Sequence, residues 1–122
     1  MGHRTVQKQY RLAKRKDFGK VYRLGQSFAN RQFVVYVLKN PGTEKMRAGV
    51  TVSRKLGTAV FRNRLRRQVK EIVRLNADRI APGHDLVIIV RKGAVGLSYR
   101  ELEKGLQHVL KRASLWIANG RP

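Results

Sequence analysis

The sequence contains no cysteine. This excludes a disulfide framework, a zinc site with thiolate ligands and a cysteine nucleophile, and it fits a reducing cytoplasm. No stretch approaches the roughly 18 apolar residues of a membrane span. The first residues, Met1-Gly2-His3-Arg4-Thr5, lack the apolar centre of a secretory signal. We therefore expect a cytoplasmic protein without a membrane partner.

Acidic residues are scarce. The chain has 7 Asp and Glu against 28 Lys and Arg, for a formal net charge of +21. Self-repulsion on this scale destabilises the folded state, so we expect a partner that neutralises it. The cations are spread along the whole chain and not confined to one amphipathic segment, which favours nucleic acid over an anionic membrane surface.

Groupings that would support catalysis are also missing. The seven acids are scattered along the chain, whereas metal-dependent nucleases need clustered carboxylates. The three histidines are isolated, and no serine has a nearby His–Asp pattern. We predict no catalytic residue in this chain, and the sequence leaves any metal site on the protein undetermined.

One segment, residues 57–74, combines an apolar stripe with a dense cationic face. At helical spacing, the apolar residues recur at intervals of three and four and define one face: Phe61, Leu65, Val69, Ile72 and Val73. The opposite half carries almost only cations, and Glu71 is its single acid. A charged helix face is usually just solvated, but arginine dominates here, and its planar fork binds phosphate through two hydrogen bonds. We therefore predict a helix that binds nucleic acid.

The remaining patterns predict a small sheet and two further helices. Residues 14–24 indicate a short helix that Gly25 ends, and residues 28–39 and 46–53 indicate strands that pair most simply as an antiparallel hairpin. The apolar run at residues 86–90 indicates a central strand that is covered on both faces. Ser98 and Glu101 form a capping box before a last helix whose apolar stripe continues to Ile117.

These elements predict one α+β domain over residues 1–122, a sandwich of helices on a small mixed sheet. The expected order is helix, two or three strands, helix, strand, helix. Residues 1–12 are expected to form a mobile basic arm, and residues 118–122 a short tail.

Residues 55–67, read as KLGTAVFRNRLRR, resemble the Arg-Asn-Arg signature of the bacterial ribonuclease P protein subunit. Further segments are similar to that family in the same order, namely residues 17–18, Gly25, residues 29–36, residues 49–53 and the pair Arg91-Lys92. The resemblance runs from about residue 11 to residue 114.

The resemblance implies a fold with a left-handed βαβ crossover, although right-handed crossovers account for about 98% of such connections. It also implies the protein subunit of an endoribonuclease that matures the 5′ end of tRNA. The partners would be a catalytic RNA and precursor tRNA, with no obligate protein partner. The active site would lie in the RNA, which would hold Mg²⁺, and the protein alone would not be catalytic or bind a cofactor of its own.

The resemblance implies two sets of functional residues. The set that would bind the catalytic RNA is Lys55, Arg62, Asn63, Arg64, Arg66, Arg67, Lys70 and Arg74. A cleft between the first helix and the sheet would bind the 5′ leader of precursor tRNA through Phe18, Tyr22, Val34, Tyr36, Val90 and Lys92. Aromatic rings beside cations suit a single strand, because bases stack on them whatever the sequence.

Two alternatives stay open at this point. A ribosomal protein, or another structural RNA-binding protein, would have similar charge and a similar fold class, and only the set of motifs argues against it. A nuclease that acts without RNA is disfavoured because the carboxylates are not clustered.

Overall fold

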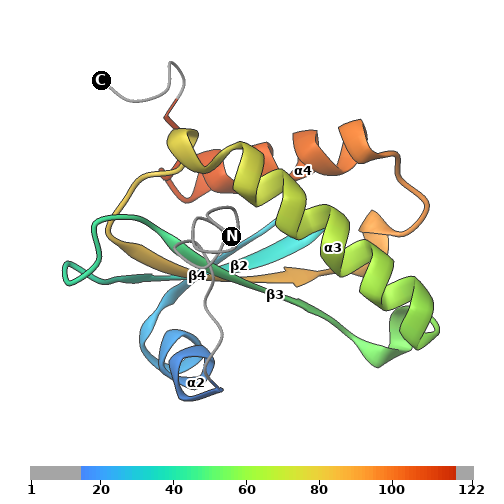
Figure 1. Ribbon diagram of the computed structural model, residues 1–122, viewed down its shortest axis with the longest axis horizontal. Helices are drawn as coiled ribbons and strands as arrows, with labels where there is room; N and C mark the ends of the chain where they lie inside the picture. Colours follow the sequence, from blue (N-terminus) through green and yellow to red (C-terminus); the bar gives the residue numbers. More distant parts are fainter. Residues whose placement is uncertain (1–14, 118–122) are drawn as a thin grey trace, which may run out of the picture.

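The computed structural model describes residues 15–117, and the predicted arm and tail lie outside them. These residues form one α+β unit of three helices and a four-stranded sheet, which confirms the predicted class (Figure 1). The elements are α2 (Arg15–Leu24), β1 (Gln26–Ala29), β2 (Phe33–Lys39), β3 (Arg47–Val52), α3 (Ala59–Leu75), β4 (His84–Val90) and α4 (Tyr99–Arg112), with short 3₁₀ turns at Arg54–Leu56, Ala77–Arg79 and Lys92–Ala94.

The sheet is mixed, with strand order β1-β2-β4-β3. β2 pairs antiparallel with both β1 and β4, whereas β3 pairs parallel with β4. The predicted central strand is confirmed, since β4 has a neighbour on each edge and Leu86, Val87 and Ile88 are fully buried. The predicted hairpin of β2 with β3 is wrong, because β4 lies between them.

The stretch predicted as one strand over residues 28–39 divides into two strands. This agrees with the predicted order, which allowed two or three strands before the second helix. The Asn30 side chain makes the break: its Oδ1 accepts hydrogen bonds from the backbone N–H of Gln32 (3.0 Å) and of Phe33 (2.8 Å). Such a turn folds the chain back without glycine or proline. β1 then pairs with β2 through this tight connection.

β3 and β4 are parallel neighbours joined through α3. Parallel neighbours cannot be joined by a tight turn, so the pairing requires a long crossover connection, which α3 provides. This is the connection for which the resemblance implies a left-handed crossover.

Helices cover both faces of the sheet, α3 and α4 on one face and α2 on the other (Figure 1). The larger core lies under α3 and α4 and includes Phe33, Val35 and Ile88. The smaller one lies under α2, where Val21 packs with Val87. Because side chains alternate along a strand, odd and even positions of β2 and β4 belong to different cores. None of the helices between residues 15 and 117 has the length and apolarity that crossing a bilayer requires.

The capping box of the last helix is confirmed: Glu101 N–H donates to Ser98 Oγ (3.2 Å), and Ser98 N–H donates to Glu101 Oε1 (2.9 Å). The helix ends at Arg112, earlier than the predicted stripe. Ser114 adopts a left-handed conformation with φ 59°, which turns the chain. Trp116 then forms an isolated β-bridge with Ile80, so the last apolar residues of the stripe pack as extended chain.

Candidate nucleic-acid interface

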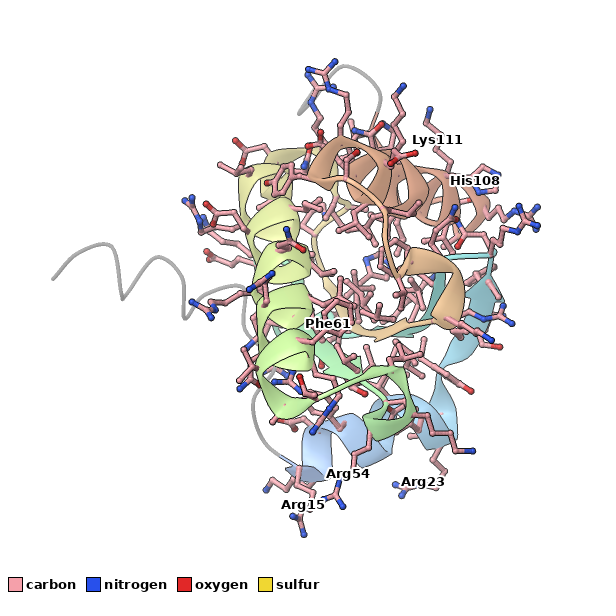
Figure 2. All side chains as sticks on the ribbon, turned by 90° about the vertical axis from the view of Figure 1, so that its right-hand side faces the viewer. Arg15, Arg23, Arg54, Phe61, His108 and Lys111 are labelled. Atoms are coloured by element: carbon pink, nitrogen blue, oxygen red, sulfur yellow. The ribbon has the colours of Figure 1, made fainter. Side chains whose placement is uncertain are left out.

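A glycine and a threonine fix where α3 begins. Thr58 is the N-cap, since its Oγ1 accepts a hydrogen bond from Phe61 N–H (3.2 Å). Gly57 has φ +152°, and a Cβ added there would lie 2.7 Å from the Phe61 ring. Any larger residue would displace Phe61, which packs against the core (Figure 2). These contacts set the direction in which the helix leaves the sheet.

The apolar stripe of α3 anchors the helix as predicted. Leu65, Val69, Ile72 and Val73 are buried, and Phe61 packs at the edge of the same core. The predicted RNA-binding residues all keep solvent access, being either exposed (Lys55, Asn63, Arg64, Arg67 and Lys70) or half-buried (Arg62, Arg66 and Arg74). Seven of them are carried by α3 and Lys55 by the 3₁₀ turn before it, and we call this set the α3 cationic face.

The α3 cationic face is not uniform, because some of its members are held by neighbours. Arg74 forms a bidentate ion pair with Glu71, in which Nε donates to Oε1 at 2.8 Å and Nη2 donates to Oε2 at 2.7 Å. This hydrogen bonding lowers the pKa of Glu71. Arg66 Nη1 donates to Asn63 Oδ1 at 2.6 Å.

Arg64 and Arg67 form no salt bridge with any acid among residues 15–117. Their guanidiniums are thus available for phosphate, whereas Arg74 is already neutralised by Glu71.

The other predicted site lies on the opposite face of the sheet, beneath α2. Tyr22 of α2 and Tyr36 of β2 make an edge-to-face contact with ring centroids 5.0 Å apart. Phe18 and Val34 are half-buried on the same side, and Tyr22 is 40% exposed. Desolvation, followed by repulsion from Tyr36, raises the pKa of Tyr22, so its hydroxyl stays neutral and able to donate.

One predicted member of this site is misplaced. Val90 is 1% exposed and lies in the core beneath α3 and α4, so it does not face α2. The pairing register explains the error: Val90 is opposite Phe33, whereas Ile89 is opposite Val34. The missed residue is Ile89, which is half-buried on the α2 side. We call Phe18, Tyr22, Val34, Tyr36 and Ile89 the α2-side surface.

Lys92, the remaining predicted member, is exposed in the 3₁₀ turn that follows β4. The turn is fixed by close packing: a Cβ added at Gly93 would collide with the Arg31 carbonyl oxygen. Arg91 N–H also donates to Gln32 O at 2.8 Å. Lys92 is therefore held near the start of β2, at the same end of the sheet as Val34.

The described residues do not fit a metal site of their own. Between residues 15 and 117, no three His, Asp or Glu side chains are grouped closely enough to hold a metal ion. We assign no chemistry to a metal bound by this part of the protein.

The ribonuclease P family model matches residues 6–114, almost the whole chain. The chain belongs to the ribonuclease P protein family. A ribonuclease P protein component from an Exiguobacterium species is 49% identical over 116 residues, which cover 95% of this chain and 100% of the relative.

Two solved ribonuclease P proteins have the same fold. The one from Staphylococcus aureus superposes with a TM-score of 0.81 at 38% identity, covering 88% of this chain and 97% of that one. The one from Thermotoga maritima gives 0.77 at 39% identity, covering 84% and 96%. The chain is thus a protein component of the tRNA-processing endoribonuclease ribonuclease P, and a purely structural ribosomal role is not favoured.

Proposed function

We propose that this chain binds the catalytic RNA of ribonuclease P through the α3 cationic face and the 5′ leader of precursor tRNA through the α2-side surface. One observation carries the proposal: the two surfaces lie on opposite faces of one sheet, and each keeps solvent access. A rigid sheet with one RNA on each side holds the substrate leader at a fixed position relative to the ribozyme.

The α3 cationic face suits a folded RNA better than a single strand. Its cations are fixed on a helix that is anchored by four buried side chains, so their spacing is set before binding. Arginine forks bind phosphate in a defined geometry, and each neutralised phosphate releases condensed counterions. Such binding is strong, salt-dependent and largely independent of base sequence.

The α2-side surface suits an unpaired leader. Aromatic rings on which bases stack contribute roughly 1–3 kcal/mol per base without selecting a sequence, as a leader that differs between tRNAs requires. Tyr22 and Tyr36 provide these rings, and α2 also carries the exposed cations Lys16, Lys20 and Arg23. The neutral Tyr22 hydroxyl donates to phosphate or ribose oxygens and does not repel them.

In this proposal the RNA subunit carries the active site and its Mg²⁺, and the protein raises the affinity for precursor tRNA. The complex acts in the cytoplasm, where bacterial tRNA precursors are made. Family membership supports both assignments, since the relatives are components of the same ribonucleoprotein enzyme.

The test compares precursor tRNA bearing a leader with mature tRNA on the reconstituted complex. Tyr36→Ala should weaken binding of the precursor by roughly 5- to 150-fold, the equivalent of one lost stacking contact, and leave mature tRNA almost unaffected. Tyr36→Phe, which keeps the ring, is the matched control and should behave like the parent. An equal loss on both RNAs would show that Tyr36 serves only to pack α2 on the sheet.

A further inference from the structure

A hollow of about 500 Å³ lies between α4 and the turn that joins β1 to β2. The turn contributes Asn30, Arg31 and Gln32 to its lining, and α4 contributes Lys104, His108 and Arg112. None of them belongs to the α3 cationic face or the α2-side surface. His108 lies on the side of α4 away from α3 (Figure 2).

Asn30 ties the turn to α4 and uses its full hydrogen-bonding capacity. Its Oδ1 accepts from two backbone N–H groups of the turn, so its orientation is fixed. Its Nδ2 donates to Gly105 O (2.8 Å) and lies 3.1 Å from His108 Nδ1. Because Nδ2 is always a donor, His108 Nδ1 accepts, and in the neutral ring the proton is on Nε2. His108 therefore keeps an N–H donor that Asn30 does not use.

Close backbone packing makes the turn rigid. Arg91 Nη1 donates to Asn30 O at 2.8 Å, and Gly93 packs directly against the Arg31 backbone. A Cβ added at Gly105 would lie 3.2 Å from the Gln32 side chain, so the helix also approaches the turn closely. The floor of the hollow is thus fixed in shape before any ligand binds.

The hollow is cationic. Arg31, Lys104 and Arg112 are exposed, and none forms a salt bridge with an acid among residues 15–117. The single acid of the lining, Glu101, accepts a hydrogen bond from the Ser98 N–H in the capping box. Three cations around one concave surface repel one another, so the arrangement favours a bound anion over an empty state.

We propose that this hollow binds backbone phosphates of the catalytic RNA, as a second contact separate from the α3 cationic face. The ligand chemistry follows from the lining: two arginine forks, one lysine and the His108 Nε2–H are donors that match phosphate oxygens. The catalytic RNA is the source because α4 and α3 cover the same face of the sheet, whereas the surface proposed for the leader lies on the other face. This inference rests on the function proposed above.

The first test measures affinity for the catalytic RNA across a salt titration. The double variant Lys104→Ala/Arg112→Ala should weaken binding by roughly tenfold or more at about 0.15 M salt and flatten the salt dependence by roughly one to two contacts. Lys39→Ala/Arg79→Ala is the matched control. It removes the same charge from exposed positions outside both proposed RNA surfaces, and it should have a clearly smaller effect.

The second test locates the contact. The chain contains no cysteine, so Lys104→Cys offers a single thiol to which an RNA-cleaving iron chelate can be attached. In the complex of protein, catalytic RNA and precursor tRNA, strand breaks should map to one region of the catalytic RNA. The proposal would be overturned if the strand breaks were confined to precursor tRNA. It would also be overturned if they were no more frequent than those produced by a chelate attached through Lys39→Cys.

The two proposals fail in different ways. If the hollow variant binds like its control while Arg64→Ala/Arg67→Ala binds weakly, the hollow is not an RNA contact and the role of α3 stands. If neither variant binds differently from the control, the assignment of this whole face to the catalytic RNA is wrong. Circular dichroism and thermal melting of each variant separate a lost contact from a lost fold.

Discussion

Replacing Arg64 and Arg67 together tests how α3 binds RNA. Both side chains are exposed, neither forms a salt bridge among the described residues, and neither contributes to the core. Folding should therefore be unaffected by Arg64→Ala/Arg67→Ala. If anything, the helix gains slightly from the loss of neighbouring like charges. Whatever changes in RNA binding then reflects contacts in the complex.

The size of the effect follows from counterion release. Each phosphate contact contributes roughly 0.7 to 0.9 to the slope of log affinity against log salt, so losing two should flatten that slope by about 1.4 to 1.8. At about 0.15 M salt this corresponds to a dissociation constant raised roughly 15- to 30-fold. Arg74→Ala should do less, because Arg74 is already paired with Glu71 at 2.7 Å.

The assay is filter binding or fluorescence anisotropy with the catalytic RNA at four or more salt concentrations. Lys39→Ala/Arg79→Ala again controls for the loss of two charges from a chain of net charge +21. Equal slopes for the two double variants would refute the argument, since the effect would then come from overall charge and not from the α3 cationic face.

Three further predictions concern the sheet and its helices. Asp85 is 5% exposed and accepts two hydrogen bonds from Arg47, both at 2.9 Å. Asp85→Ala should lower the free energy of unfolding, measured by urea denaturation, by about 2–3 kcal/mol. This is below the usual cost of breaking a fully buried pair, because the Arg47 side chain becomes hydrated once its partner is removed. Val90→Ala should lower the free energy of unfolding by about 2 kcal/mol and leave leader binding unchanged. Ile89→Ala should instead weaken leader binding. The reverse pattern would contradict the assignment of Ile89, and not Val90, to the α2 side of the sheet. Hydrogen bonding to the backbone and side chain of Ser98 lowers the pKa of Glu101 from its ordinary value. The unfolded chain therefore binds more protons in acid, and the contribution of Glu101 to stability is lost as the pH falls through its lowered pKa. Glu101→Gln should remove this part of the acid dependence of thermal melting, and an unchanged acid dependence would refute the assignment.

Local sequence patterns are sufficient to predict those elements whose ends and buried faces are marked by nearby residues. The α3 stripe and the Ser98 capping box are local patterns, and the structure confirms both of them. β4 was identified as central because an uninterrupted apolar run needs cover on both faces. These predictions needed no knowledge of which segment lies beside which.

Strand neighbours and fine register were not available from periodicity. Nothing local shows that β4 enters between β2 and β3, so the simplest pairing, a hairpin, was wrong. The turn at Asn30 was missed because its signal is one side-chain amide and not a glycine or proline. The resemblance implied Val90 for the leader site, and this was wrong because neighbouring residues of a strand point to opposite faces, so Ile89 and not Val90 faces α2.

The hollow beside α4 had no sequence signal at all. Arg31 is far along the chain from Lys104 and Arg112, and only the folded turn brings them together. In contrast, the cations of α3 are close together in sequence, and helical spacing alone predicts that they lie away from the buried stripe. Sites built on a single helix are readable from spacing, whereas sites assembled from separate elements need the fold.

The most direct test of the central claim is reconstitution. The chain is added to its catalytic RNA at low Mg²⁺, and release of the 5′ leader from precursor tRNA is measured beside reactions that omit either component. We expect efficient processing only when both are present, and reduced processing with Arg64→Ala/Arg67→Ala. Processing by the RNA that is unchanged when the chain is added, or cleavage by the protein without RNA, would contradict the account.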